Sequence, residues 1–310
     1  MSPCPVSPVE EAAGVLGRRA RRQVPLGPLT TYRVGGPAAL LMEASSEADL
    51  ELAREAVTAS GVPVLVVGRG SNLLVSEAGF PGLAVVPAGL DAVTVDAQAL
   101  RARAEAGVLL PVLARRTAAA GLTGLEWAVG VPGSVGGAVR MNAGGHGADV
   151  AATLARFRFV DLSGGEDGEF SAERLHFGYR HSTVAPHHVV VWAEFALEAG
   201  DRAASEARIA DIVRWRREHQ PGGQNAGSVF TNPPGDSAGR IVEAAGLKGA
   251  RWGSAHVSTK HANFIQVDDG GSADDVVALI RQVRERVRAE VGVDLEPEVC
   301  LIGFGTGRST

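Results

Sequence analysis

Two glycine-rich stretches carry the clearest chemical signal in this sequence. The first, Gly68-Arg69-Gly70-Ser71-Asn72-Leu73, directly follows the apolar run 63–67, which is typical of a short buried strand. The second runs from Gly130 to Gly145. A pyrophosphate needs backbone N–H donors with no side chain in the way, and glycine meets both conditions. Both stretches are therefore candidates for binding a phosphate-bearing ligand.

The common nucleotide fingerprints do not describe these stretches. Neither is a G-x-G-x-x-G that opens a helix, and no Walker A sequence occurs. Each stretch alone is equally compatible with a tight turn in a glycine-rich protein. Two of them, about 60 residues apart and each beside a strand, favour a large dinucleotide bound from two sides. The spacing alone does not specify FAD.

Three polar residues could act on a bound substrate, although each is ordinary by itself. Arg180 follows a tyrosine at the edge of a strand, and a lone arginine is usually a solvated surface charge. Ser228 follows a glycine in a turn, and no G-x-S-x-G motif marks it as a hydrolase nucleophile. Glu298 follows a proline near the C-terminus and is by default an exposed carboxylate. Residue types alone do not assign a role to any of them.

Alternating strand and helix patterns surround these residues. We expect helices over 46–60, 108–120, 201–219, 237–245 and 274–290, the first capped by Ser46 and ended by Gly61. We expect strands over 63–67, 83–86, 93–97, 102–106, 157–159, 189–195, 263–267 and near 293–301. The pattern of the sequence changes near residues 198–200, where we place a domain boundary. The predicted division is an N-terminal extension (1–28), a first domain (29–198, two subdomains split near 88) and a C-terminal domain (199–310).

Composition restricts the classes of protein that fit. A chain of 310 residues suits two or three small domains, and a net charge of −5 argues against general nucleic-acid binding. Cys4 and Cys300 are too few for a disulfide framework or zinc site, and no apolar run is long enough to span a membrane. His187-His188 has no acidic or cysteine partner at ligand spacing, so we expect no metal site. We expect a cytoplasmic monomer with no nucleic-acid or membrane partner.

The ordered motifs resemble the UDP-N-acetylenolpyruvoylglucosamine reductase family, from Leu29 to Glu298. They are 30-TTYRVGGPA-38, 68-GRGSNLL-74, the Gly130–Gly145 stretch, 178-GYRHS-182, 226-AGSVFTNP-233, 261-HANF-264 and 295-LEPEV-299. The resemblance implies an α+β fold. It has a two-part FAD-binding domain of the vanillyl-alcohol-oxidase/PCMH-type superfamily and a C-terminal α+β substrate-binding domain.

The resemblance also implies the chemistry. The family's substrate is an enol ether, UDP-N-acetylglucosamine enolpyruvate, which is reduced with NADPH to UDP-N-acetylmuramate for peptidoglycan. Hydride from non-covalently bound FAD reaches the β-carbon, and Ser228 would protonate the α-carbon. Arg180 would stabilise the charge that develops on the substrate carboxylate, and Glu298 would act there as a protonated hydrogen-bond donor.

Two further sets of residues follow from the same reasoning. The expected FAD contacts are Gly68, Arg69, Gly70, Ser71, Asn72, Leu73, Gly133, Ser134, Gly136, Gly137 and Asn142. The expected substrate contacts are Tyr179, Arg217, Gln220 and Asn232, for three of which a helix end and a turn are the structural alternative.

Some positions depart from the family pattern. Thr231 replaces a frequent lysine, and His146 replaces a frequent tyrosine, where it either covers the flavin or fills a loop. Only 47 positions separate Arg180 from Ser228, so the chain resembles the shorter subgroup without an inserted lid. A flavin-dependent alcohol or sugar oxidase of the same superfamily, or a non-catalytic nucleotide-sugar-binding flavoprotein, is the alternative.

Overall fold

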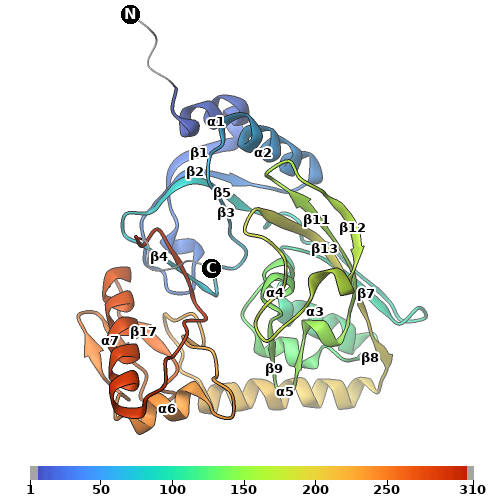
Figure 1. Cartoon of the computed structure of the whole chain (residues 1–310). Coiled ribbons are helices and arrows are strands. Elements are labelled where there is room, and N and C mark those ends of the chain that lie inside the picture. Colours follow the sequence, from blue (N-terminus) through green and yellow to red (C-terminus); the bar gives the residue numbers. More distant parts are fainter. Residues whose placement is uncertain (1–5, 306–310) are drawn as a thin grey trace, which may run out of the picture. The chain divides into compact units, whose positions relative to one another are not determined.

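The computed structural model describes residues 6–305, which divide into two compact units (Figure 1). Unit 1 consists of residues 6–24, 39–69 and 81–215, and unit 2 of residues 25–38, 70–80 and 216–305. The sequence predicted consecutive segments with boundaries at 28/29 and 198/199, whereas these units are interleaved along the chain. One reason is that β4 (Leu73–Val75) pairs in parallel with β18 (Cys300–Ile302), which places an early segment among the C-terminal residues.

A five-stranded antiparallel sheet forms one layer of unit 1. Its order is β12-β11-β13-β7-β6. Phe157 and Phe159 of β11 are both buried while Arg156 is exposed, so the alternation predicted for this strand is confirmed. The strands are β6 (Val93–Asp96), β7 (Arg101–Glu105), β11 (Leu154–Asp161), β12 (Gly168–Ser171) and β13 (His188–Ala196).

A four-stranded sheet with the order β1-β2-β5-β3 accompanies helices α1 and α2. The predicted cap of α2 is confirmed: the Ser46 side chain accepts from the Asp49 N–H, and Gly61 ends the helix with a φ of 68°. Ala12 and Leu16 of α1 are buried in the apolar core that also contains residues of α2 and β5. Part of the predicted N-terminal extension is therefore built into unit 1. The elements are α1 (Pro8–Leu16), β1 (Ala20–Pro25), β2 (Pro37–Glu43), α2 (Glu47–Ser60), β3 (Val64–Val66) and β5 (Phe80–Val86).

The second glycine-rich stretch contains a helix that the sequence did not predict. Helix α4 (Val135–Met141) forms although Gly136 and Gly137 disfavour helix, because Val135, Ala138 and Val139 are buried in the core of unit 1. Burial therefore outweighs the glycine propensity. The neighbouring elements are α3 (Leu110–Ala119), β8 (Leu122–Thr123), η3 (Glu126–Gly130), β9 (Gly144–Gly145), β10 (Ala148–Asp149), η4 (Val150–Ala152), η5 (Ala172–Leu175) and β14 (Glu198–Ala199).

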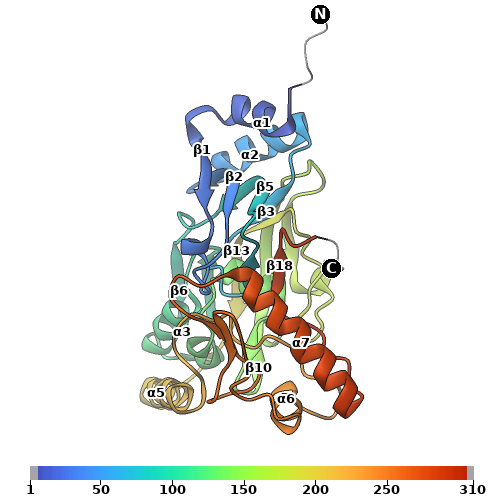
Figure 2. The same cartoon turned by 90° about the vertical axis from the view of Figure 1, so that its left-hand side faces the viewer.

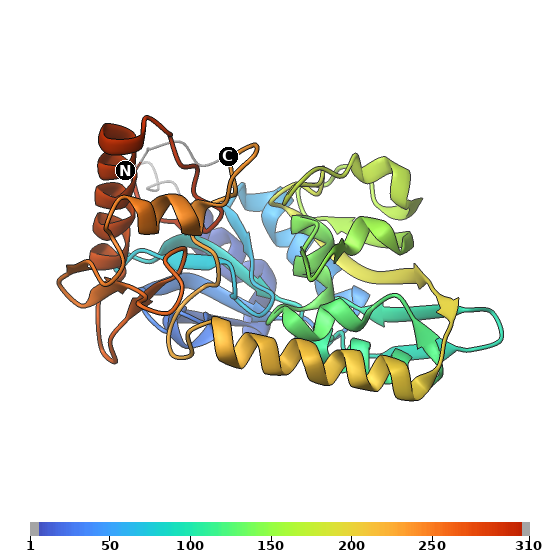
Figure 3. The ribbon, with the colours of Figure 1, turned by 90° about the horizontal axis from the view of Figure 1, so that it is seen from below.

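Helix α5 (Arg202–His219) is one uninterrupted helix, drawn in yellow in Figure 3, and it contains the unit boundary between Trp215 and Arg216. Ile209 and Ile212 are buried as predicted. Trp215, which the sequence placed on the apolar side, is 42% exposed instead. Its ring packs edge-on against His146, with 5.1 Å between the centroids.

The core of unit 2 lies between helix α7 and a three-stranded antiparallel sheet with the order β15-β16-β17 (Figures 1 and 2). The predicted apolar face of α7 is confirmed, since Val276, Ile280 and Val283 are all buried. Tyr32, Val34 and Leu74 join this core from the early segments. The elements are α6 (Ala238–Ala244), β15 (Arg251–Trp252), β16 (Ala255–Val257), β17 (Ile265–Val267) and α7 (Ala273–Val291), with η1 (Gly17–Arg19) and η2 (Gly27–Leu29) earlier in the chain.

None of the helices in residues 6–305 combines the length and apolar character needed to cross a membrane. The Cys300 sulfur lies 3.9 Å from the Asn72 side-chain nitrogen, and Cys4 lies outside the described residues.

Candidate active site

In unit 1, the start of the first glycine loop meets the second glycine stretch. A Cβ atom added to Gly68 would lie 2.7 Å from the Ser134 hydroxyl oxygen. That oxygen is buried and has no hydrogen-bond partner among the described residues. A buried hydroxyl without a partner is costly, so it marks a place where a ligand acceptor fits. Arg69, the next residue of the loop, is exposed.

The two adjacent glycines of helix α4 face different surroundings. A Cβ atom on Gly136 would lie 2.9 Å from the Cβ atom of Ala106, so glycine is needed there for packing. The N–H groups of Val135 and Gly136 donate to the carbonyls of Val108 and Ala106, and are not available to a ligand. A Cβ atom on Gly137 would meet only the Ser134 hydroxyl, at 3.9 Å. Of the two, Gly137 is therefore the glycine that leaves room for a ligand.

The remainder of the first loop belongs to unit 2 and is tied to the end of the chain. Gly70 has a φ of 62°, and a Cβ atom there would lie 2.2 Å from the Leu29 carbonyl oxygen. The Asn72 side-chain amide donates to the Glu298 carbonyl oxygen at 3.1 Å, and the Cys300 N–H donates to the Asn72 carbonyl. Ser71 is half-buried, and Leu73 begins β4. The structure therefore gives Asn72, predicted as an FAD contact, a role in holding the Glu298 segment.

Arg180 lies on a tight turn of unit 1. Two backbone hydrogen bonds join Gly178 and His181 across the turn, and Arg180 has a φ of 55°, an uncommon value for a residue with a side chain. Its guanidinium donates to the Gly144 carbonyl oxygen at 2.9 Å and lies 5.0 Å from the Tyr179 ring centroid. Backbone outliers of this kind cluster at functional sites.

Asn142 anchors this turn. Its amide donates to the Gly178 carbonyl oxygen at 2.9 Å and to the Asp149 carboxylate at 3.1 Å, and its oxygen accepts from the Ala151 N–H at 3.0 Å. The residue is 3% exposed and has a φ of 42°, which asparagine tolerates well. Its side chain is thus occupied inside the protein, so the FAD contact predicted for it would have to come from the backbone.

Unit 2 brings the segments of Ser228 and Glu298 together. The Glu298 N–H donates to the Val229 carbonyl oxygen at 2.7 Å, and the Thr231 N–H donates to the Glu296 carbonyl oxygen at 2.9 Å. Phe230 and Pro297 form an antiparallel bridge. Ser228 and Glu298, whose residue numbers differ by 70, therefore lie on adjacent backbone segments. Within residues 6–305, the Ser228 hydroxyl has no hydrogen-bond partner and is half-buried.

The other predicted substrate contacts have structural partners. The Gln220 side-chain oxygen accepts from Arg216, and the Asn232 oxygen accepts from the Ala238 N–H at the start of α6. Arg217 is exposed, and its carbonyl oxygen accepts from Lys260. Burial lowers the pKa of Arg216, the half-buried neighbour of Arg217 that the sequence reasoning passed over. Tyr179 is 58% exposed.

His146 packs within its loop: its ring lies 3.1 Å from the position of a Cβ on Gly130 and touches Trp215. These contacts are those of a residue that fills a loop.

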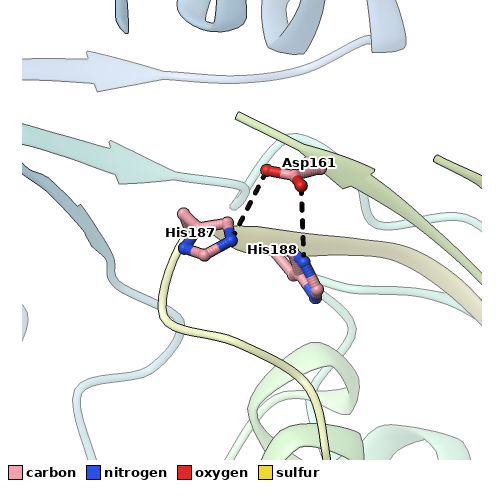
Figure 4. A group of neighbouring side chains, drawn as sticks. All are labelled: Asp161, His187 and His188. Carbon is pink, nitrogen blue, oxygen red and sulfur yellow. Dashed lines mark ion pairs between the residues drawn. The ribbon is translucent and has the colours of Figure 1, made fainter. Parts of the chain in front are cut away.

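A cluster of Asp161, His187 and His188 corrects one prediction (Figure 4). Asp161 of β11 lies 3.6 Å from the Nε2 atoms of both histidines, so the pair does have an acidic partner. The sequence concealed it, because Asp161 lies on another strand. Burial alone would raise the pKa of Asp161, but hydrogen bonds from Ser163 and the nearby histidines lower it.

The hydrogen bonds of His188 oppose metal binding at this cluster. Its Nδ1 accepts from the Ala185 N–H at 3.2 Å, so the proton of the neutral ring lies on Nε2. A metal on Nε2 would move that proton to Nδ1 and break the bond to Ala185. Burial also lowers the pKa of His188, which keeps the ring neutral. The cluster thus fits a hydrogen-bonded corner of the sheet better than a metal site.

Comparison with known proteins assigns different family profiles to the glycine-rich part of the chain and to its C-terminal part. A family profile described as an FAD binding domain matches residues 38–166. A second, described as the C-terminal domain of UDP-N-acetylenolpyruvoylglucosamine reductase, matches residues 219–302. Solved structures of low identity share the fold alone, such as BBE-like 1 of Physcomitrella patens (13% identity, TM-score 0.56, 90% of this chain and 88% of that one).

Two relatives are much more similar. A UDP-N-acetylenolpyruvoylglucosamine reductase of Rubrobacter xylanophilus is 43% identical over 92% of this chain and 95% of its own. The crystal structure of the corresponding reductase of Thermus caldophilus superposes with a TM-score of 0.78 at 36% identity, covering 92% of this chain and 99% of that one. The chain therefore belongs to the UDP-N-acetylenolpyruvoylglucosamine reductase family.

Proposed function

We propose that this chain reduces UDP-N-acetylglucosamine enolpyruvate to UDP-N-acetylmuramate, with bound FAD and with NADPH as reductant, in peptidoglycan precursor synthesis. The single observation that carries the proposal is the 43% identity to a reductase of this name over 92% of the chain. FAD, when bound, supplies the hydride that is added to the β-carbon of the enol ether. We place the enzyme in the cytoplasm, as a monomer of the subgroup without a lid.

The FAD site is assigned to both glycine stretches. The orphaned Ser134 hydroxyl and the open space at Gly137 fit a group that brings hydrogen-bond acceptors close to the backbone. Gly68 is opposite Ser134, and the exposed Arg69 offers a cation for a phosphate. Gly136 supports this surface through packing, and Asn142 supports it by fixing the end of α4.

Ser228 donates the proton to the α-carbon. Its hydroxyl is not engaged by another described residue, so its proton is available to a substrate. Serine is a weak acid, so it acts only on a strongly basic carbon held close to it. The Glu298 N–H is bonded to the carbonyl oxygen of Val229, the residue after Ser228, which gives a physical reason for the side chains of Ser228 and Glu298 to serve the same substrate.

Arg180 stabilises the negative charge that develops on the substrate carboxylate during the reaction. A guanidinium is always charged and matches a carboxylate with two parallel N–H donors. Its bond to the Gly144 carbonyl oxygen fixes one nitrogen of the guanidinium. Tyr179, Arg217, Gln220 and Asn232 are assigned to the rest of the nucleotide-sugar. NADPH and the enol ether use one site in turn, because neither glycine stretch is a second dinucleotide fingerprint.

The decisive experiment is an anaerobic absorbance measurement on the purified protein. NADPH should bleach the flavin band, and subsequent addition of the enol ether should restore it. Failure of the enol ether to restore the band would overturn the proposed function. In deuterated buffer the product should carry solvent deuterium at the α-carbon, whereas the hydrogen at the β-carbon should come from the flavin.

The Ser228→Ala variant tests the proton donor. It should bind FAD and accept electrons from NADPH at rates close to those of the unmodified enzyme. Oxidation of its reduced flavin by the enol ether should slow by about 10²–10⁴-fold, the usual contribution of general acid catalysis. A wild-type rate in this second half-reaction would contradict the role of Ser228. An equal loss in both half-reactions would instead show that Ser228 shapes the shared site.

Denaturation tests the non-covalent character of the cofactor. The released supernatant should be yellow, since the contacts of His146 are those of a packed loop residue. Flavin that stays on the precipitated chain would implicate His146 as a covalent tether.

A further inference from the structure

The segment that carries Ser228 is hydrogen-bonded along both of its edges. Residues 296–298 pair with one edge, through Glu296 and Glu298. Asn263 binds the other edge with its backbone and its side chain. The Val229 N–H donates to the Asn263 carbonyl at 2.8 Å, and the Phe230 N–H donates to the Asn263 side-chain oxygen at 3.0 Å. The Asn263 amide in turn donates to the Phe230 carbonyl oxygen at 2.9 Å.

Both side-chain hydrogen bonds of Asn263 go to the backbone of Phe230. Asn263 is 3% exposed. Its side chain binds both the N–H and the C=O of Phe230, as the backbone of a neighbouring strand would. Its own N–H donates to His261 Nδ1, which fixes the loop from which the side chain projects. A buried side-chain amide that satisfies an N–H and a C=O together leaves both unpaired when it is removed.

The Ser228 hydroxyl, by contrast, is not held by any bond from another described residue. Its position therefore depends on the backbone on either side of it: Asn225 binds the preceding Gly227, and Asn263 binds the following Val229 and Phe230. We infer that Asn263 is a positioning residue for the reduction: it sets the height of the 228–230 backbone and thereby the distance from the Ser228 hydroxyl to the carbon that it protonates. The inference rests on the proposed function.

The chemistry makes this reaction sensitive to such positioning. A weak acid delivers its proton only across a short, well-aligned contact. A displacement of about 1 Å at a reacting group can cost about 10²-fold in rate. Without the Asn263 side chain, this edge keeps only the bond from the Val229 N–H to the Asn263 backbone carbonyl. Both polar groups of Phe230 then lose their partner, so the backbone there can shift away from its position.

A pure packing role is the competing explanation, and Ser258 provides a matched control for it. Ser258 is 1% exposed, and its hydroxyl accepts from the N–H groups of Lys260 and His261 in the same loop. It makes no hydrogen bond with residues 228–231 among the bonds of the described chain. Ser258→Ala should therefore weaken the loop without moving the catalytic serine.

The experiment compares Asn263→Ala, Asn263→Asp, Ser258→Ala and Ser228→Ala holoenzymes and the double variant Asn263→Ala/Ser228→Ala. Rates of flavin reduction by NADPH and of its re-oxidation by the enol ether are measured separately, together with the thermal midpoint of each variant. Asn263→Ala should slow re-oxidation by about 10²-fold while reduction changes less than about threefold. Asn263→Asp, which keeps the acceptor for Phe230, should lose less and covers the case in which the alanine variant fails to fold.

The double variant decides between positioning and general destabilisation. If Asn263 acts through Ser228, its replacement should add almost nothing once Ser228 is alanine, because residues that act as a unit are non-additive. Full additivity of the two effects would overturn the inference, and so would an equal loss in Ser258→Ala. If the unmodified enzyme is not re-oxidised by the enol ether at all, the proposed function itself fails, and the inference fails with it.

Discussion

The turn of Arg180 and the segment of Ser228 are held in opposite ways. The turn is local: Gly178 and His181 close it with backbone bonds. Two buried side chains fasten its ends to the rest of unit 1, since Asn142 donates to the Gly178 carbonyl oxygen and Ser182 donates to the Arg140 carbonyl oxygen. The Ser228 segment has one local bond, from the Gly227 N–H to the Asn225 side-chain oxygen. It depends on Asn263 and on residues 296–298, which come from distant parts of the sequence. A local turn can store backbone strain at one residue, whereas a paired segment distributes its support over many bonds.

This difference suggests how each region fails. The Arg180 turn should lose most of its function when one residue is changed, because Asn142 and Ser182 hold different ends of it and neither duplicates the other. The Ser228 segment should lose function in steps, because several independent hydrogen bonds define it. Four sets of substitutions test how these regions and their neighbours are held, from the largest expected effect to the smallest.

Arg180→Lys should have the largest effect. Lysine keeps the charge but not the planar fork, and the bond to the Gly144 carbonyl oxygen is also lost. Removal of one electrostatic stabiliser usually costs about 10²–10³-fold in kcat. Steady-state kinetics should show this loss with stability unchanged, and Arg208→Lys, an exposed arginine of α5, should behave as the parent enzyme. A kcat within threefold of the parent would remove Arg180 from the mechanism.

Asn142→Ala should destabilise unit 1 by about 1–3 kcal/mol, because it leaves Gly178, Ala151 and Asp149 without their partner. Denaturant unfolding measures the loss. The kcat should fall as well, since the Arg180 turn loses its anchor. Asn142→Gly separates the two causes, because glycine accepts the φ of 42° but cannot make the bonds. If Asn142→Gly keeps full activity, backbone conformation rather than the amide holds the turn.

The neighbouring glycines of α4 distinguish packing from ligand approach. Gly136→Ala should destabilise the apoprotein by about 1–3 kcal/mol, because the new methyl group meets Ala106. Gly137→Ala should leave apoprotein stability within about 1 kcal/mol of the parent, since the site is open. FAD affinity, measured by fluorescence titration, should nevertheless fall for Gly137→Ala. Unchanged affinity would show that the cofactor does not approach the backbone there.

Asn72→Ala should have the smallest effect, about 0.5–1.5 kcal/mol, the usual net contribution of one hydrogen bond. Its amide bond to the Glu298 carbonyl oxygen is lost, but the backbone pairing of β4 with β18 and of Val229 with Glu298 remains. Thermal unfolding and FAD titration together check this. A large loss of FAD with little change in stability would return Asn72 to the cofactor contacts that its motif suggested.

The sequence predicted the elements whose formation depends on residues close together in the chain. Helix α2 follows from the cap at Ser46 and the glycine at position 61, and α7 follows from its apolar spacing. Helix α4 could not be predicted in the same way, because glycine propensity opposes it and only the burial of Val135 and Val139 explains it. The interleaving of the units also escaped prediction, since the pairing of β4 with β18 has no local signature.

The candidate site shows the same limit. Motif resemblance selected Arg180, Ser228 and Glu298 from types that are individually unremarkable. It could not show that Asn72 and Asn142 use their side chains inside the protein. Nor could it show that Asn263 binds the backbone of Val229 and Phe230, next to Ser228. Asp161 was missed beside His187 for a similar reason, since the contact joins two strands that are distant in sequence. Patterns identify the groups that react, and tertiary contacts identify those that hold them.

The interleaved chain has a consequence for synthesis on the ribosome. Tyr32, Val34 and Leu74 emerge early, but the core that buries them also needs residues as late as Val299. At about 5–20 residues per second, these side chains wait roughly ten to fifty seconds before their partners exist. During this interval the nascent chain presents apolar surface that a chaperone can shield. Premature termination before α7 should therefore yield an aggregating fragment rather than a smaller stable protein.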